Sequence, residues 1–184
     1  MTSLTSDQVA GDVFVAGFGD GVVRVYDTRV HAKSAMVRIW REHRQWVTGV
    51  RMQRGGVREL VSASRNGEVR LWDLRSDKSV LQLNVTGTGA NTAAPGETVR
   101  TLALHEHAPV LALGTDRGEV RSWSTSGEAL GVFDPLGTAK GVAATVVGAA
   151  TGRKNPVVAT AYHPHQMVLA CTAASTRGVS LVSY

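Results

Sequence analysis

A twelve-residue pattern that occurs three times limits what this chain can fold into more than any other feature of its sequence. The copies begin at Ala16, Ser62 and Leu113 and align without gaps. Each copy has glycine at its sixth place, valine at its eighth, arginine at its ninth and an aromatic residue at its eleventh. Self-similarity of this kind indicates a repeat architecture, in which one small unit is built several times over.

Each copy has the pattern of a β-hairpin. An apolar stretch leads into a turn that holds Asp-Gly, Asn-Gly or Arg-Gly, and an alternating stretch follows it. Glycine supplies the positive φ that tight turns between strands require, so we expect Gly21, Gly67 and Gly118 to be turn residues. A weaker fourth copy over 173–184 would give Gly178 the same role. The first two of these glycines lie 46 residues apart, close to the roughly 40–45 residues of a propeller repeat.

Further strand-like stretches lie between the hairpins and bring the total to about four strands per repeat. They follow or precede the hairpins at 36–40, 47–52, 80–85, 99–104, 130–133 and 157–162. No amphipathic helix of useful length is evident. The sequence therefore predicts an all-β chain with repeats at about 1–41, 42–86, 97–134 and 155–184. The stretches 87–96 and 137–154 are interpreted as linkers, with 142–147 as a weak strand candidate.

Composition bounds the class of protein further. Apolar residues make up 43% of the 184 residues, enough for a buried core, and glycine contributes 20 residues. The single cysteine, Cys171, excludes a disulfide framework and a paired-cysteine metal site, and favours a reducing compartment. The N-terminal residues lack a basic start and an apolar block, so we expect a cytoplasmic protein without a signal peptide. No cofactor-binding motif is present.

The second copy, with the residues before it, resembles a WD40 repeat. Glu42-His43, Trp46 and the run Ser64–Asp73 carry this resemblance. It implies a β-propeller, whose blades are sheets of four antiparallel strands around a central channel. The stretch Val15–Arg29, followed by Met36–Val47, narrows the match and is similar to the C-terminal propeller of the Raptor family, its fungal members especially. Residues 104–110 and 162–165 resemble the same family.

The resemblance implies a partial propeller of about four blades out of seven, whose remaining blades lie elsewhere in a longer chain. The outer strand of the last blade would then come from outside this sequence. The implied function is a non-catalytic scaffold that recruits substrates and regulators to the TOR kinase in TOR complex 1. The implied partners are proteins and the rest of the same propeller, without a small-molecule substrate. The implied location is the cytoplasm, including the vacuolar or lysosomal membrane surface as part of a complex.

Two other functions are alternatives to the scaffold. A generic WD40 adaptor, such as a ubiquitin-ligase substrate receptor, would have the same repeats. A nucleic-acid-binding propeller is suggested by the net charge of +5, but no interleaving of basic and aromatic residues is evident. Which rim of the propeller binds a partner is not encoded in any motif, and the loops at 51–58 and 137–154 are the first candidates.

Five residues are expected to form the hydrogen-bonded set of a WD40 blade: His43, Ser62 or Ser64, Asn66 and Trp72. In that set the histidine bridges the turn residue and the serine hydroxyl, and the indole N–H donates to the serine. A Ser–His pair can also mark a nucleophile, but a propeller buries this histidine against tryptophan, so catalysis is disfavoured. Asn66 stands where the family prefers aspartate, which removes a charge.

Two other motifs suggest chemistry and are interpreted as structural. The pairs His105/His107 and His163/His165 have metal-ligand spacing on a strand, but they lie at strand ends without a carboxylate cluster. The arginines at the ninth place of each copy, Arg24, Arg70 and Arg121, could form a phosphate-binding stripe. Pairing with acidic neighbours or packing of their stems between blades is the favoured interpretation. No metal site, cofactor site or catalytic residue is predicted.

Overall fold

The computed structural model consists of short antiparallel strands. It describes residues 1–7, 9, 11–53, 60–85, 97–134, 144–146, 155–174 and 179–183. Within these ranges the helical content is one 3-10 turn, η1 (Ala32–Ser34), and no helix there is long and apolar enough to cross a membrane. The chain divides into two compact units, Met1–Thr86 and Gly87–Tyr184.

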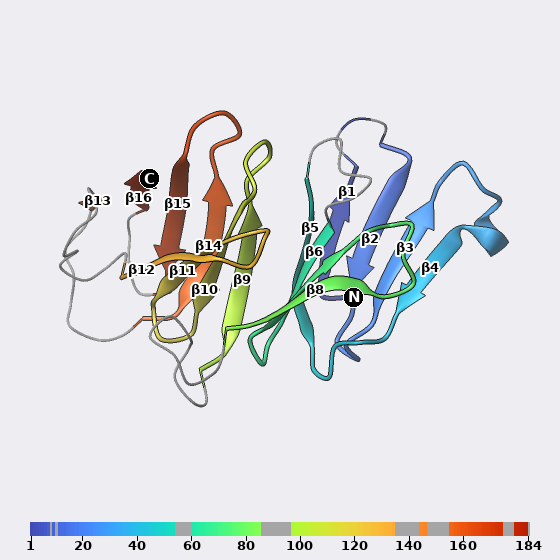
Figure 1. The fold of residues 1–184 in the computed structure, drawn as a ribbon, viewed down its shortest axis with the longest axis horizontal. Helices are drawn as coiled ribbons and strands as arrows, with labels where there is room; N and C mark the ends of the chain where they lie inside the picture. The colour runs from blue at the N-terminus through green and yellow to red at the C-terminus, as the bar shows by residue number, and fades with distance from the viewer. Residues whose placement is uncertain are drawn as a thin grey trace. The chain divides into compact units, whose positions relative to one another are not determined.

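The first unit contains two four-stranded sheets, and in each of them the strands follow one another in chain order (Figure 1). The strands of the first sheet are β1 (Ser3–Ser6), β2 (Val13–Gly17), β3 (Val23–Asp27) and β4 (Met36–Trp40). Those of the second are β5 (Val47–Met52), β6 (Leu60–Ser64), β7 (Glu68–Trp72) and β8 (Ser79–Asn84). All neighbouring strands pair antiparallel, which is the arrangement of a propeller blade.

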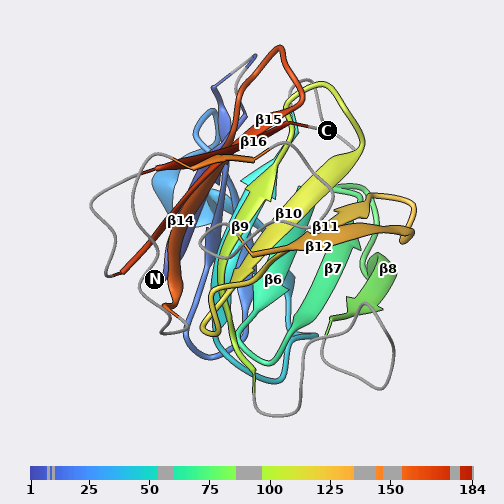
Figure 2. The ribbon, with the colours of Figure 1, turned by 90° about the vertical axis from the view of Figure 1, so that its left-hand side faces the viewer.

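The second unit also contains two four-stranded antiparallel sheets (Figure 2). The strands of the third sheet, in order, are β9 (Val99–Leu104), β10 (Val110–Thr115), β11 (Val120–Ser124) and β12 (Ala129–Phe133). The fourth sheet has the order β14 (Val157–Tyr162), β15 (Val168–Ala173), β16 (Ser180–Ser183) and β13 (Ala144–Val146). The all-β fold class predicted from the repeats is therefore confirmed.

The outer strand of the fourth sheet differs from the expectation. It was expected to lie outside the sequence, whereas β13 occupies this place and pairs antiparallel with β16. The strand comes from the middle of 137–154, the stretch interpreted as a linker. Its three residues precede the rest of their sheet in the chain, so the repeat pattern, which orders strands by sequence, does not reveal this pairing.

The glycines of the hairpin turns have two separate reasons to be glycine. Gly21, Gly67 and Gly118 have φ values of 81°, 84° and 87°, in the left-handed region where a Cβ is strained. A Cβ on Gly21 would also clash with the main-chain carbonyl oxygen of His43, in the loop that leads into the next sheet. Gly178 lies outside the described residues.

The core of the first unit lies between its two sheets. Nine buried residues form one cluster that spans both sheets: Val15, Val23, Val25, Trp40, Val47, Val50, Met52, Leu60 and Trp72. The indoles of Trp40 and Trp72 stack with their centroids 4.7 Å apart, and Trp40 Nε1 donates to the carbonyl oxygen of Ser76 at 3.2 Å. Strand β1 lies beside β5, where Val50 N donates to Ser3 Oγ at 3.1 Å. The two sheets are thus in contact both at their first strands, β1 and β5, and near their last strands, through Trp40.

The two sheets of the second unit also pack face to face. Their core contains Ala103, Ala112 and Val120 from the third sheet and Val157, Leu169 and Cys171 from the fourth. A hydrogen bond of 3.0 Å joins the hydroxyls of Thr101 and Thr160 across them. Cys171 is buried, and burial raises the pKa of its thiol to about 11.

Candidate interaction site

A buried polar set lies in the second sheet, around the hydroxyl of Ser62. The ring nitrogen Nε2 of His43 lies 2.6 Å from Ser62 Oγ, and Trp72 Nε1 donates to the same oxygen at 2.7 Å. Because the indole donates to this oxygen, the serine O–H is free to donate to the histidine. Ser62 is fully buried and His43 nearly so, which leaves no access for a substrate. The Ser62 hydroxyl is thus buried and contacts both the imidazole and the indole.

The two other residues named for this set have different positions. The hydroxyl of Ser64 is buried and has no hydrogen-bond partner in the described ranges. Asn66 Oδ1 accepts a hydrogen bond from the main-chain N–H of Glu68 at 3.2 Å, as a turn residue does. The charge that faces His43 Nδ1 comes from Glu68, whose Oε2 lies 3.7 Å away. This distance is too long for a hydrogen bond, so the interaction is electrostatic.

The electrostatics of His43 favour its neutral form. Burial is the main cause, and together with the positive charge of Arg70 it lowers the pKa of His43 to about 4, against the opposing effect of Glu68. At neutral pH the ring is therefore uncharged. A neutral ring with its proton on Nδ1, toward Glu68, leaves Nε2 free to accept from Ser62.

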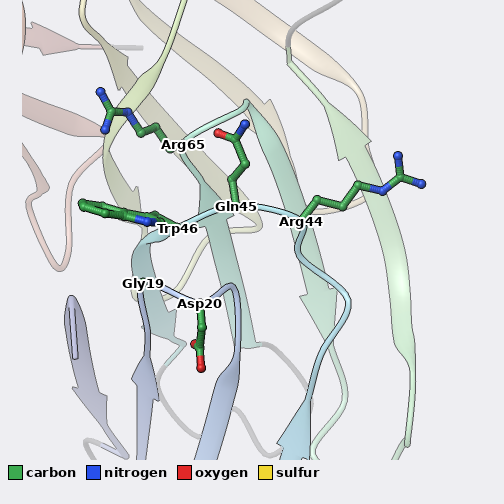
Figure 3. Close-up of a pocket in the computed structure, with 6 residues that line it drawn as sticks. All are labelled: Gly19, Asp20, Arg44, Gln45, Trp46 and Arg65. Atoms are coloured by element: carbon green, nitrogen blue, oxygen red, sulfur yellow. The ribbon is translucent and has the colours of Figure 1, made fainter.

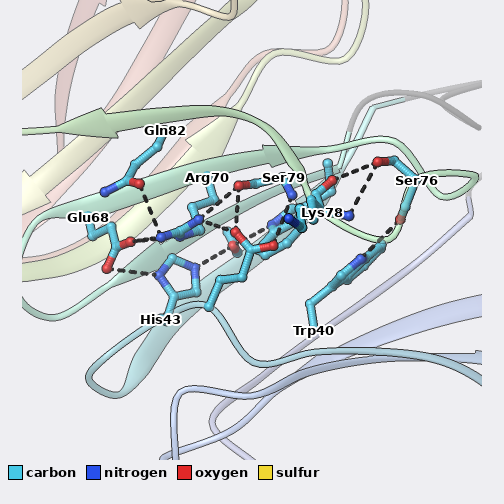
Figure 4. Close-up of polar contacts among 11 residues, drawn as sticks. Trp40, His43, Glu68, Arg70, Ser76, Lys78, Ser79 and Gln82 are labelled. Carbon is cyan, nitrogen blue, oxygen red and sulfur yellow. Dashed lines mark hydrogen bonds and ion pairs between the residues drawn. The ribbon is translucent and has the colours of Figure 1, made fainter.

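Arg70 is the centre of a second buried network, which Figure 4 shows beside His43. Its guanidinium donates to Glu68 Oε1 at 2.6 Å, to Ser79 Oγ at 2.8 Å and to Gln82 Oε1 at 3.1 Å, and it pairs with Glu42. Burial raises the pKa of Glu42, but hydrogen bonds from Ser79 and the charge of Arg70 outweigh it, and the net pKa is lowered. The network joins β7 and β8 to the loop that precedes β5.

The three arginines at the ninth place of the repeat do not form an exposed stripe. Arg70 and Arg121 are buried, and Arg121 pairs with Glu119 at 2.7 Å and with Glu97 at 3.5 Å. Arg24 lies over the ring of Phe18, 4.4 Å from its centroid. Arg70 and Arg121 thus form ion pairs with glutamates, and Arg24 contacts an aromatic ring. These contacts give no support to a phosphate-binding stripe.

The two His-x-His pairs meet in the second unit. His105 Nδ1 accepts from the main-chain N–H groups of His107 and Ala108, and its Nε2 lies 3.2 Å from the carbonyl oxygen of Gln166. The rings of His107 and His165 stack with centroids 5.4 Å apart. Among the described residues, no group of three or more histidine, cysteine or acidic side chains could hold a metal ion. His105 therefore connects two loops of the unit.

An open pocket of about 410 Å³ lies at one end of the first unit (Figure 3). Its lining comes from the β2–β3 turn, the loop before β5 and the β6–β7 turn: Gly19, Asp20, Arg44, Gln45, Trp46 and Arg65. The side chain of Trp46 is 57% exposed, although the next residue, Val47, is fully buried. Because successive side chains of an extended chain point to opposite sides, Val47 lies in the core and the indole of Trp46 lies at the surface.

One cation lies beside this exposed indole, and a second lies further along the same rim. The guanidinium of Arg65 lies 5.9 Å from the ring centroid of Trp46, and Arg44 projects on the other side of Gln45 (Figure 3). Neither arginine forms an ion pair with any residue that the structure describes. The carboxylate of Asp20 is the one acidic group of the lining, and its Oδ1 accepts a hydrogen bond from Val22 N at 3.1 Å.

The repeat pattern does not indicate this pocket. Trp46 is a mark of the repeat in that pattern, and the loops favoured for partner binding, 51–58 and 137–154, lie mostly outside the described residues. The local signal is a tryptophan that directly follows a charged and an amide residue, in Arg44-Gln45-Trp46. What the sequence does not contain is the approach of Arg65, which is 19 residues further along the chain.

Comparison with known proteins identifies the class. Residues 34–73 match the family described as WD domain, G-beta repeat. The β-propeller domain of Cps50 (Swd1) from Myceliophteria thermophila matches all of this chain and 53% of its own, with a TM-score of 0.72 and 16% sequence identity, which shows the fold alone. Together with the four antiparallel sheets, these matches define the chain as a WD40-repeat protein with a β-propeller fold.

Two further matches identify the family. The crystal structure of Chaetomium thermophilum Raptor is 42% identical, covers 99% of this chain and has a TM-score of 0.79. The target of rapamycin complex 1 subunit KOG1 of Saccharomyces cerevisiae is 40% identical over 94% of this chain. The chain belongs to the Raptor family and corresponds to its WD40 region. It spans 14% of the Chaetomium chain and 12% of KOG1.

Proposed function

We propose that this chain is a non-catalytic, protein-binding part of a TOR complex 1 scaffold. The observation that carries the proposal is the 42% identity to Chaetomium Raptor over 99% of the chain, with a TM-score of 0.79. KOG1, which is 40% identical, is itself named as a subunit of that complex. The buried state of the Ser62–His43 pair supports a role without catalysis.

The proposal includes the place of these sheets in a larger assembly. The four sheets would be blades of a propeller that further sheets of the same protein complete. The match to the Cps50 propeller over only 53% of its chain supports this, since nearly half of that β-propeller domain has no counterpart in this chain. Such blades form a rigid support, and their loops present side chains to other proteins.

Affinity purification tests the proposal directly. The gene product would be tagged in the cells that encode it, and the copurifying proteins identified by mass spectrometry. A TOR kinase is expected among the major partners. Recovery of a cullin ubiquitin ligase without any TOR kinase would contradict the proposal and support the adaptor alternative.

A further inference from the structure

We propose that the pocket around Trp46 binds an acidic, extended segment of a partner protein. The inference rests on the proposed function, because it assigns the chemistry of one partner to a protein-binding surface. The segment would place carboxylates against Arg44 and Arg65 and an apolar or aromatic side chain against the indole. The argument depends on residues of the first unit only: Gly19, Asp20, Arg44, Gln45, Trp46 and Arg65.

The exposed indole is the first reason. Tryptophan is a large apolar side chain, and leaving 57% of Trp46 in water gives up most of the stabilisation that its burial would provide. The other tryptophans of this unit, Trp40 and Trp72, are almost completely buried and stack on each other. Tryptophan and arginine are the residue types most enriched where protein partners bind most strongly. A partner that covers Trp46 would therefore be stabilised by burying the exposed apolar surface of the indole.

The unpaired arginines are the second reason. Among the other arginines of the first unit, Arg29 pairs with Asp27, Arg38 with Asp77, and Arg75 with Asp73. Arg44 and Arg65, in contrast, stand at the pocket with no ion pair to any described residue. A guanidinium presents a planar set of N–H donors that matches a carboxylate in two parallel hydrogen bonds. The two side chains are therefore available for carboxylates from another protein.

The arrangement of the lining favours an extended segment over a single small anion. Arg44 and Arg65 lie on opposite sides of Gln45, and Trp46 lies next to Arg65 (Figure 3). The two guanidiniums point in different directions in Figure 3, and an extended chain can place successive side chains on each. Gly19 has no side chain and lies close to the indole, since the position of its Cβ would be 3.8 Å from the ring, so main chain faces Trp46 on this side of the pocket.

The same arrangement disfavours a nucleic acid. A continuous phosphate backbone requires a track of cations. This pocket has two separate arginines and also the carboxylate of Asp20, which would repel phosphate. An acidic peptide can avoid Asp20 by placing an uncharged residue there. Single-stranded RNA becomes an outcome of the test below.

Fluorescence anisotropy with the purified 184-residue chain tests the inference. The probe is a fluorescein-labelled peptide, Gly-Ser-Glu-Glu-Tyr-Glu-Glu-Ser-Gly, and its partner has glutamine in place of every glutamate. We expect the acidic peptide to bind and the glutamine peptide to bind at least tenfold more weakly. The double variant R44A/R65A and the variant W46A should each weaken the acidic peptide by about tenfold or more. Raising the ionic strength from about 0.05 M to about 0.5 M should weaken it too.

Matched controls keep the result interpretable. Arg100 is exposed, lies in the second unit and forms no ion pair with a described residue. The variant R100A removes one positive charge away from the pocket, against two removed by R44A/R65A, and should leave binding unchanged. Since the three pocket side chains are exposed, their variants should melt at the temperature of the unaltered chain. Equal binding of both peptides, equal losses for R100A and R44A/R65A, or tighter pocket-dependent binding of a single-stranded RNA would overturn the inference.

The failure of this inference can be separated from that of the proposed function. If a TOR kinase copurifies with the tagged protein while the acidic peptide does not bind, the function stands and the pocket assignment is wrong. If the peptide binds through the pocket residues and no TOR kinase is recovered, the assignment stands and the TOR complex proposal is wrong.

Discussion

At the scale of single residues, the polar side chains of this protein are of two kinds. Those inside the sheets, such as His43 and Arg70, are held by hydrogen bonds and ion pairs and serve stability. Those at the rim, such as Arg44 and Arg65, have no ion pair with the described residues and remain available for binding. The two kinds lie only a few residues apart in the loop before β5, so burial separates their roles more clearly than residue type does.

The buried neutral His43 predicts a loss of stability in mild acid. The folded chain holds this ring unprotonated down to a pKa of about 4, while the unfolded chain protonates it near the ordinary value of 6.5. Protons therefore bind the unfolded state preferentially between these values, and the free energy of unfolding falls as the pH drops through this window. The fall attributable to His43 between pH 7.5 and pH 5.0 is about 2 kcal/mol. Urea unfolding followed by tryptophan fluorescence at pH 7.5, 6.0 and 5.0 measures it.

The variant His43→Gln provides the control for that titration. Glutamine does not titrate, so the free energy of unfolding of the variant should change much less between pH 7.5 and pH 5.0. At pH 7.5 it should also be lower than that of the unaltered chain. Glu42, whose pKa is lowered, contributes acid sensitivity only below its ordinary value of 4.5 and so outside this range. A slope in the variant equal to that of the unaltered chain would show that another group is responsible.

Gly21 predicts a cost of substitution beyond that of its φ angle. Alanine at φ 81° is strained by about 1–2 kcal/mol, and its Cβ would also push against the carbonyl oxygen of His43. Gly11 has a similar φ of 70° with nothing within 4 Å of a Cβ, so Gly11→Ala measures the angle alone. We expect Gly21→Ala to lower the free energy of unfolding by at least about 1 kcal/mol more than Gly11→Ala. Equal losses in urea unfolding would show that the loop moves aside freely.

The sequence pattern predicts part of the buried polar set around Ser62, but it predicts neither the charge beside His43 nor the pocket around Trp46. His43, Ser62 and Trp72 are recognisable from a WD40 repeat, and in the structure they meet at one hydroxyl. Glu68 takes the charged position near His43, which the pattern does not indicate because the residue belongs to the strand after the turn. The pocket depends on the approach of three segments, namely the β2–β3 turn, the loop before β5 and the β6–β7 turn, and on the exposure of Trp46. Neither property is encoded in a single stretch of sequence.

At the scale of elements, the strands follow from local sequence. Alternating apolar residues and glycine turns specify β2–β3, β6–β7 and β10–β11, because both the strand period and the turn φ are local properties. The pairing of β13 with β16 is different, since it joins residues 34 or more positions apart and skips two strands. Long-range pairings of this kind are decided by packing and so were not predicted.

The fourth sheet can be tested through its single thiol. Cys171 lies on β15 and is 2% exposed, and burial raises the pKa of its thiol from 9.0 to about 11. The thiolate is the reactive form, so alkylation by iodoacetamide at pH 8 should be about 100-fold slower in the folded chain than in the chain unfolded in urea. A native rate equal to the rate in urea would show that the fourth sheet does not close over this residue in solution.

At the scale of the whole molecule, the account makes two separate claims, one about fold and one about family. The Cps50 propeller shares the fold at 16% identity, while KOG1 shares the sequence at 40% identity. If function depended only on the WD40 fold, either this chain or the Cps50 propeller could replace the matching segment of KOG1. If function depends on surface residues of the Raptor family, only this chain could replace it.

Domain replacement in KOG1 is the most direct test of the central claim, which is that this chain is a functional counterpart of the WD40 region of a TOR complex 1 scaffold. One chimera would have the matching segment of KOG1 replaced by this chain, and a control would have it replaced by the matching part of the Cps50 propeller. We predict that the first chimera copurifies with the TOR kinase as well as unaltered KOG1 does, and that the control does not. Failure of the first chimera, with normal expression, or equal success of both would contradict the claim.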